Sequence, residues 1–203
     1  MPRQRRATRR RNDTGGRVTH LLLLCCAGTA AARTGAFAAP GDLLDASGRA
    51  RAAALRLPGP APDRVFASPV AAARETADLM GLGTVAETRL ADIGHGAWTG
   101  RLFTEVHLAD PDAFARWLAA PEAGTPGGET FATLAGRVGA WLGEQAAAGG
   151  TVLGVTHPMV LRAALHAAIG LAPAVAMRID LPPLGLVRLS FNRGWRLQSL
   201  TPA

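Results

Sequence analysis

Three short apolar segments of this sequence are each followed by a turn and then by a helix-forming segment. They run from 18 to 24, from 64 to 67 and from 151 to 156. Continuous apolar runs of this length are typical of parallel strands buried on both faces, and the helices after them predict crossover connections. The sequence therefore predicts an α/β fold, a three-layer sandwich with a mostly parallel sheet flanked by helices on both faces.

The segments between and after these units complete the expected order of elements. Further strands are predicted at 85–90, 174–179, 185–191 and 195–200, and helices at 49–57, 111–118, 130–147 and 159–169. Ser68 is the expected cap of another helix, with Pro69 at its first position. Ligands of such sheets bind beyond the carboxyl ends of the strands. Four residues are therefore expected at one edge of the sheet: Cys25, Cys26, Ser68 and His157.

The distribution of charge limits the possible partners. Residues 1–17 contain seven arginines and one aspartate, and so carry +6 of the formal net charge of +7. The sequence predicts a basic, disordered tail over 1–17 and one domain over 18–203. Because this domain shows no basic face, no nucleic-acid partner is expected. No apolar run approaches the roughly 20 residues that cross a bilayer, so no membrane-spanning segment is expected.

The N-terminal region also fits an export signal, with an Arg-rich start, the apolar run 21–26 and small residues at 36–39. Two residues disagree with that interpretation: Arg33 lies before the cleavage site, and Leu24 stands where a lipoprotein signal has a small residue. Cleavage would also remove the first predicted strand. Adjacent cysteines cannot join distant parts of the chain, which favours reduced thiols. A cytoplasmic protein is expected, with export as the alternative.

Five segments of the chain, in this order, carry a resemblance to a known family. They are CCAGTAAA (25–32), SPVAAARETA (68–77), LADIGHGAWTG (90–100), PGGET (126–130) and VTHPMVLR (155–162). They resemble segments of the histidine phosphatase (phosphoglycerate mutase-like) superfamily, which has Arg-His-Gly-Glu-Thr after its first strand. The α-ribazole phosphatase type is the most similar branch, and the resemblance covers residues 18–200.

This resemblance implies roles for individual residues. Asp92 falls where the family has its acidic proton donor, His157 falls at the second active-site histidine, and Thr29 matches the threonine of the first segment. The phosphate pocket departs from the family at four positions. Cys26 replaces the nucleophilic histidine, Cys25 and Ala72 replace arginines, and Ala32 replaces an asparagine.

Three further residues bear on the chemistry of this pocket. Cys26, if placed at the N-terminus of a helix, would have a lowered thiol pKa and could accept a phosphoryl group. Arg33 is the candidate replacement for a lost arginine, although six residues separate it from Cys26 where tyrosine phosphatases have five. Arg74 is two positions from Ala72 and is expected to face away, since two helical positions rotate a side chain by about 200°.

The resemblance implies phosphomonoester hydrolysis of a small phosphorylated metabolite, impaired or altered because the nucleophilic histidine and both arginines are absent. A catalytically inactive pseudo-phosphatase that serves as a binding or regulatory module is the alternative. Structural roles also remain open, with Cys26 as a small buried hydrophobe, Asp92 as a loop cap and His157 as a hydrogen-bonded core residue. Neither a metal nor a cofactor is expected, because no zinc-spaced cysteine set or dinucleotide fingerprint is present.

Overall fold

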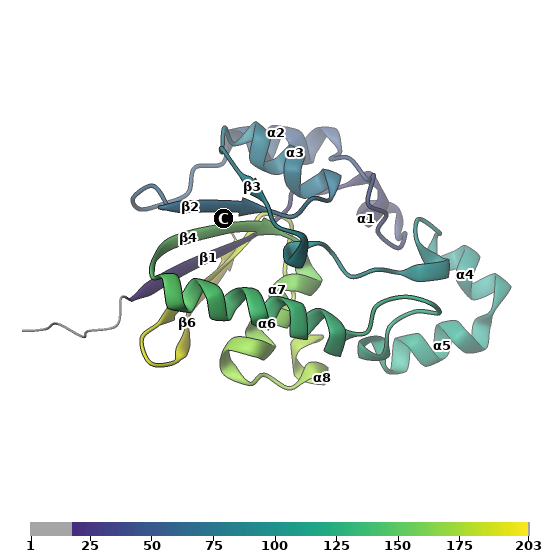
Figure 1. Cartoon of the computed structure of the whole chain (residues 1–203). Coiled ribbons are helices and arrows are strands. Elements are labelled where there is room, and N and C mark those ends of the chain that lie inside the picture. The colour runs from purple at the N-terminus through teal and green to yellow at the C-terminus, as the bar shows by residue number, and fades with distance from the viewer. Residues whose placement is uncertain (1–17, 203) are drawn as a thin grey trace, which may run out of the picture.

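The computed structural model describes residues 18–202, in which a six-stranded sheet lies between two layers of helices (Figure 1). The basic segment 1–17, predicted as a disordered tail, lies outside the described residues. No helix within the described part is long and apolar enough to cross a membrane.

The sheet has the strand order β3-β2-β4-β1-β5-β6. The strands are β1 (Thr19–Cys25), β2 (Arg64–Ala67), β3 (Val85–Ala86), β4 (Gly150–Thr156), β5 (Gly185–Phe191) and β6 (Trp195–Pro202). β3, β2, β4 and β1 pair in parallel, whereas β5 is antiparallel to both β1 and β6. The predicted α/β fold with a mostly parallel sheet is thereby confirmed.

The helices cover both faces of this sheet (Figure 1). They are α1 (Ala30–Thr34), α2 (Ala46–Ala54), α3 (Ala71–Leu79), α4 (Phe103–Ala109), α5 (Pro111–Ala119), α6 (Phe131–Ala148), α7 (Pro158–Ile169) and α8 (Pro173–Ala176). α2 and α3 lie above the sheet in this view, and α6, α7 and α8 lie below it. α4 and α5 extend beyond the carboxyl ends of the parallel strands, around a separate aromatic cluster that contains Phe37 and Trp98.

β1 shows how the sequence builds two hydrophobic cores from one strand. Side chains of a strand alternate between its faces. Leu21, Leu23 and Cys25 therefore join the core between the sheet and helices α6 and α7. Leu24 joins the core between the sheet and helices α2 and α3, together with Cys26, which follows the strand directly. The strand is buried on both sides, as its continuous apolar sequence predicts.

The centre of β4 has a glycine because a large side chain lies over it. A Cβ atom on Gly154 would lie 2.9 Å from a Leu23 methyl group and 3.4 Å from the Trp141 ring. Trp141 is fully buried there and packs edge-to-face on Phe66, with 5.8 Å between ring centroids. Gly154 therefore leaves the space in which Trp141 of α6 packs against the sheet.

Several predicted elements differ from the structure. The segment 174–179 was expected to form a strand, but Pro173 begins the short helix α8, which buries Ala176 against the lower layer. The strand predicted at 85–90 is limited to β3, because residues 88–90 turn into a 3₁₀ helix. The helix predicted at 49–57 runs instead over 46–54, where the Asp45 side chain caps its N-terminus. α1 and α4 were not predicted.

Ser68 does not cap α3, contrary to the sequence-based expectation. α3 begins at Ala71 with Val70 at the N-cap position, and the Ser68 hydroxyl accepts a hydrogen bond from the Val70 amide at 3.2 Å. Pro69 therefore precedes the helix rather than opening it.

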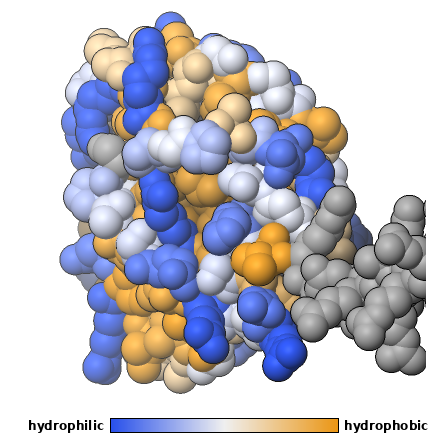
Figure 2. Space-filling view, turned by 90° about the vertical axis from the view of Figure 1, so that its left-hand side faces the viewer, coloured by the Kyte–Doolittle hydropathy of each residue, from blue (hydrophilic) through white to orange (hydrophobic). Residues whose placement is uncertain are grey.

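The end of the molecule at which β1 begins carries mixed side chains. Figure 2 shows hydrophilic residues interspersed with hydrophobic ones across this face. The predicted functional residues lie at the opposite end of the parallel strands.

Candidate active site

A cavity of about 340 Å³ opens at the carboxyl ends of the parallel strands. It is bordered by the connections that leave β1, β2 and β4 and by the loop after the 3₁₀ helix at 88–90. Six of the seven predicted site residues line it: Cys25, Cys26, Thr29, Ala72, Asp92 and His157. The topology thus brings together residues that are up to 132 positions apart in the sequence.

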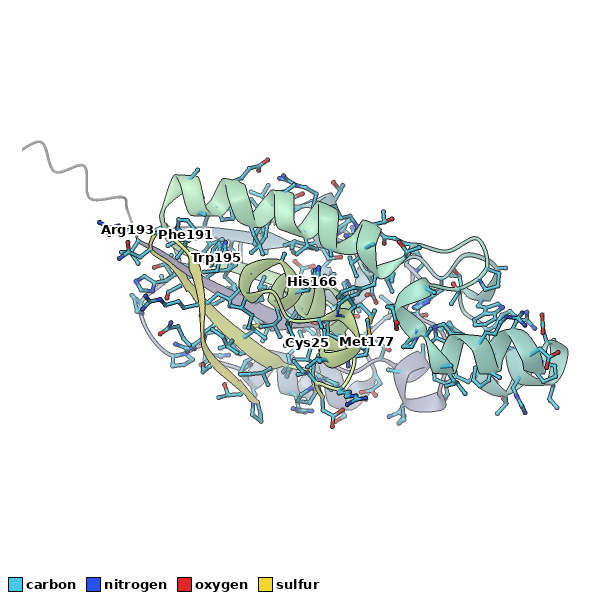
Figure 3. The ribbon with its side chains drawn as sticks, turned by 90° about the horizontal axis from the view of Figure 1, so that it is seen from below. Cys25, His166, Met177, Phe191, Arg193 and Trp195 are labelled. Carbon is cyan, nitrogen blue, oxygen red and sulfur yellow. The ribbon has the colours of Figure 1, made fainter. Side chains whose placement is uncertain are left out.

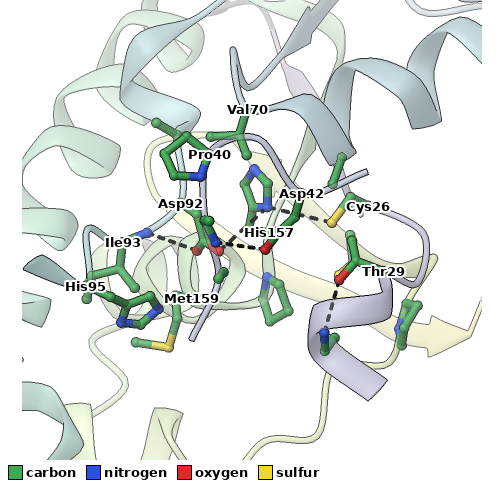
Figure 4. A pocket seen from close by; sticks show the side chains of 18 of the residues that line it. Cys26, Thr29, Pro40, Asp42, Val70, Asp92, Ile93, His95, His157 and Met159 are labelled. Atoms are coloured by element: carbon green, nitrogen blue, oxygen red, sulfur yellow. Dashed lines mark hydrogen bonds and ion pairs between the residues drawn. The ribbon is translucent and has the colours of Figure 1, made fainter. Parts of the chain in front are cut away.

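His157 is the central polar residue of this cavity (Figure 4). It follows β4 directly, precedes Pro158 of α7, and is 3% exposed. Its Nε2 lies 2.9 Å from the hydroxyl of Ser68, which follows β2. Its Nδ1 faces the other way, 3.6 Å from the Cys26 sulfur and 3.7 Å from an Asp92 carboxylate oxygen.

The surroundings of His157 favour its protonated form. Burial opposes a charge on the imidazole, yet the negative charge of Asp92 and the hydrogen bond with Cys26 outweigh burial and raise the pKa of His157. When protonated, the ring donates from Nε2 to Ser68 and directs its Nδ1 proton toward Asp92. His157 is thus positioned to hold a proton at the base of the cavity.

Cys26 lies against His157 but is not activated as the sequence suggested. The residue is 8% exposed, and its amide donates to the Thr156 carbonyl at 2.7 Å, which ties it to the end of β4. The contact with the neighbouring Cys25 thiol, together with burial, raises the pKa of Cys26 well above that of an ordinary thiol. The nearby helix α1 has only five residues, so it offers little of the expected N-terminal stabilisation. The expected lowering of the Cys26 pKa is therefore wrong.

Cys25 reaches the cavity from the opposite side of the sheet. Its side chain belongs to the core beneath α7, against which Met177 also packs (Figure 3). The two neighbouring cysteines thus belong to different hydrophobic cores, and both are free. Neither provides a positive charge to the cavity.

Asp92 is fixed by its backbone as well as by its side chain. One carboxylate oxygen accepts a hydrogen bond from the Ile93 amide at 2.9 Å, which leaves the other toward His157. Arg137 of α6 donates to the carbonyl oxygens of Arg89 and Ala91, each at 2.8 Å, and to that of Asp92 at 3.1 Å. The loop that carries the acid is therefore held by α6.

Glu129, from the PGGET segment, completes this support. It accepts two hydrogen bonds from Arg137, at 2.7 and 2.8 Å, and its amide donates to the Gly94 carbonyl. The same segment packs closely on Gly96, where an added Cβ atom would lie 2.4 Å from the Pro126 carbonyl. The motif was recognised in the sequence without a role for Glu129, and Arg137 was missed because only the fold brings it to the loop.

Comparison with known proteins identifies the family. The sequence profile of the histidine phosphatase superfamily (branch 1) matches residues 21–201. The chain belongs to this superfamily.

Two relatives resemble part of this chain, and one of them is a phosphatase by name. Phosphoserine phosphatase 1 of Hydrogenobacter thermophilus is 33% identical over 115 residues, which are 53% of this chain and 54% of that protein. A bifunctional protein of Mycobacterium tuberculosis is 33% identical over 132 residues, 61% of this chain and 34% of that protein. The chain thus spans about half and about a third of the length of these two relatives.

Solved structures of the superfamily share the fold along nearly the whole chain. The α-ribazole phosphatase of Shigella flexneri gives a TM-score of 0.80 at 20% identity, covering 91% of this chain and 96% of that one. A mycobacterial glucosyl-3-phosphoglycerate phosphatase gives 0.78 at 20% identity, covering 92% and 100%. The phosphoglycerate mutase-like architecture implied by the resemblance is thereby confirmed.

Arg33, proposed from the sequence as a replacement for the superfamily's phosphate-binding arginines, lies elsewhere. It does not line the cavity, and its guanidinium pairs with Asp45 at 3.0 Å with 65% of the side chain exposed. Thr29 lines the cavity, but its hydroxyl caps α1 by accepting from the Ala32 amide at 3.1 Å. Arg74 is exposed on α3, as expected from its offset from Ala72.

The cavity also contains two ionisable residues that the sequence analysis did not select. Asp42 and His95 both line it, from the connection before α2 and from the loop after Asp92. Burial lowers the pKa of His95, although the charge of Asp92 partly opposes this effect. Within residues 18–202, no arginine or lysine lines the cavity.

Proposed function

We propose that this chain is a histidine phosphatase superfamily protein with impaired phosphomonoesterase activity, which uses the active-site cavity to bind a small molecule. The observation that carries this proposal is the composition of the described cavity wall. It holds two carboxylates and no guanidinium or ammonium group. A binding role is therefore favoured over efficient hydrolysis of a phosphorylated metabolite.

Phosphoryl transfer requires cations around the equatorial oxygens and a nucleophile in line with the leaving oxygen. Loss of one charge-stabilising contact at a transition state costs about 10²-fold or more in rate. The resemblance implies that two such arginines are replaced by Cys25 and Ala72, which both line the cavity. Cys26 occupies the nucleophile position as an uncharged thiol, because its pKa is raised. A neutral thiol is a poor nucleophile, and so both requirements are unmet.

The pair Asp92 and His157, which can hold and donate a proton, supports a slow residual phosphatase activity. His157 Nδ1 and an Asp92 carboxylate oxygen lie 3.7 Å apart, and the resemblance assigns these residues the roles of second histidine and acid. They could still protonate a leaving alcohol. Slow turnover of a small phosphate ester, which is the class on which the phosphatase relatives act, is the second candidate function.

The test is hydrolysis of p-nitrophenyl phosphate by the full chain and by Cys26→Ala and His157→Ala. We expect very slow turnover that changes little with Cys26→Ala. Rapid turnover by the unmodified chain that Cys26→Ala abolishes would contradict the proposal. Circular dichroism and the thermal midpoint serve to verify that each variant is folded.

A second experiment asks whether three of the four departures from the family are responsible. Cys25→Arg, Cys26→His and Ala72→Arg are combined, with and without Asp92→Asn. We expect the triple variant to gain at least about 10²-fold in rate, and Asp92→Asn to remove most of that gain. A folded triple variant without any gain would show that other features of the cavity prevent hydrolysis.

We also infer a cytoplasmic location. Both cysteines are free, which suits a reducing compartment. β1 lies in the middle of the sheet, so cleavage near residues 36–39 would remove its central strand. These observations support the interpretation of the N-terminal region as part of the domain from residue 18 onward, preceded by a basic tail.

A further inference from the structure

The charges of the cavity are unsuited to an anion. Asp42 and Asp92 both line it, and the side chain of Asp92 is 16% exposed. The thiols of Cys25 and Cys26 add no positive charge. Because burial lowers the pKa of His95, this imidazole is neutral at physiological pH. Protonated His157 offsets at most one of the two carboxylates.

Three arginines from segments that border the cavity are bound by other partners. Arg33 pairs with Asp45, and Arg137 is bound by Glu129 and by backbone carbonyls. Arg162, one turn into α7, donates to the Ile179 carbonyl at 2.9 Å. A phosphate in the cavity would therefore meet carboxylates without a compensating guanidinium, and desolvation of a dianion in such a site is strongly unfavourable.

The remainder of the wall is apolar. Val70, Ile93 and Met159 line the cavity together with several alanines and prolines. Its volume of about 340 Å³ lies at the lower end of the range for small-molecule sites. Such a wall favours a ligand with a compact hydrocarbon body, which gains from leaving water.

Asp42 is oriented by its own loop. Its Oδ2 accepts a hydrogen bond from the Ala39 amide at 2.8 Å, which fixes the carboxylate at the cavity wall (Figure 4). In Asp92, Oδ1 is bound to the Ile93 amide and Oδ2 faces His157. Each carboxylate is thus held by one backbone amide through one of its two oxygens.

From these observations we propose that the cavity binds an organic amine, with its ammonium group at Asp42 and Asp92 and its hydrocarbon body against Val70, Ile93 and Met159. This inference rests on the proposed binding function, and it names the chemical class of the ligand. A cation with an apolar body satisfies both the unbalanced carboxylates and the apolar wall. A phosphate ester would instead place a further negative charge beside these carboxylates.

Four probes that share one phenyl group distinguish the possible ligand classes: 4-phenylbutylamine, 4-phenylbutan-1-ol, 4-phenylbutyrate and phenyl phosphate. Binding to the full chain is measured by isothermal titration calorimetry at pH 7. We expect the amine to bind about tenfold more tightly than the alcohol, as a charge-assisted hydrogen bond contributes, and the two anions to bind more weakly still. Equal binding of amine and alcohol, tighter binding of either anion, or no amine binding would overturn the proposal.

Substitutions then test the two carboxylates. Asp42→Asn combined with Asp92→Asn should lower the affinity for the amine about tenfold and leave the affinity for the alcohol unchanged. Asp112→Asn, on the exposed side of α5, is the matched control and should change neither. Unchanged amine affinity in a folded double variant would refute the assignment. If the double variant does not fold, the ranking of the four probes on the unmodified chain still decides.

The test of the amine ligand and the test of impaired phosphatase activity can fail independently. Rapid hydrolysis of p-nitrophenyl phosphate would refute impaired catalysis whichever probe binds best. Conversely, a chain without phosphatase activity that prefers phenyl phosphate to the amine would refute only the ligand class proposed above.

Discussion

The two walls of the cavity are built on different physical principles. The acid wall comprises residues 91–95 with Glu129 and Arg137 behind them, and it is a network of ion pairs and backbone hydrogen bonds. The thiol wall comprises Cys25, Cys26, Ala32 and Ala72, which are small side chains, three of them buried. The side chains of the first wall are polar groups that depend on one another, whereas those of the second contribute mainly by packing.

The resemblance implies that Cys25, Cys26 and Ala72 stand where the family has arginine and histidine, and this difference explains how such replacements can leave the fold intact. Replacement of arginine or histidine by cysteine or alanine removes charges, and what remains is apolar and needs no partner. A comparable substitution in the acid wall would leave a charge in a partly buried site without its counterion. Chemistry can therefore change on the thiol wall at a small cost in stability.

The largest expected effect tests this contrast directly. Arg137→Ala removes the partner of Glu129 and the support of three carbonyl groups, so it should lower the free energy of unfolding by about 3 kcal/mol. Cys26→Ala, on the thiol wall, should lower it by about 1 kcal/mol. Urea denaturation measures both, with the exposed Arg116→Ala as control. Equal losses at the two walls would remove the distinction between them.

The next effect concerns the thiol wall alone. Because the Cys26 pKa is raised, iodoacetamide should alkylate this residue at pH 8 at least about tenfold more slowly than it alkylates glutathione. The rate should still increase above pH 8.5, the ordinary pKa of a thiol. Cys25→Ala removes the contact that raises the pKa most, so Cys26 should react faster in that variant. A plateau below pH 8 would show that Cys26 is a thiolate after all.

A smaller effect links the acid wall to the two histidines of the cavity. The charge of Asp92 raises the pKa of both His157 and His95, against the effect of burial. Asp92→Asn should therefore lower both values, which NMR titration of the imidazole C–H signals would follow. His107, on α4 outside the cavity, provides the internal reference. An unchanged His157 titration would mean that Asp92 does not act on this ring.

The smallest expected effect lies outside both walls. Arg33→Ala removes an exposed ion pair with Asp45, so it should change the free energy of unfolding by less than about 1 kcal/mol. It should also leave the affinity for 4-phenylbutylamine unchanged, because Arg33 does not line the cavity. A substantial change in that affinity would place Arg33 near the ligand and extend the site beyond the two walls.

The sequence predicted the sheet and its buried strands because apolar side chains in β1 and β4 must be covered on both faces. It was wrong about residues 174–179, where a proline and the packing of α8 override a strand-like pattern. Six of seven predicted site residues lie in the cavity, since strand ends meet at one edge. The raised Cys26 pKa depends on burial and on how the Cys25 thiol lies, and the contacts of Arg137 depend on where α6 crosses the loop. Such properties arise from tertiary structure, and local sequence patterns do not encode them.

The pairing of β1 has a consequence for synthesis of the chain. Thr19 pairs with Gly150 on one side and with Phe191 on the other. During synthesis this strand leaves the ribosome long before β4 and β5 are made. Its four consecutive leucines therefore stay unpaired until those strands are available. Distant pairings of this kind slow folding and leave strands open to aggregation. We expect nascent chains that end before β4 to require a chaperone, and those that extend past β5 to be released from it.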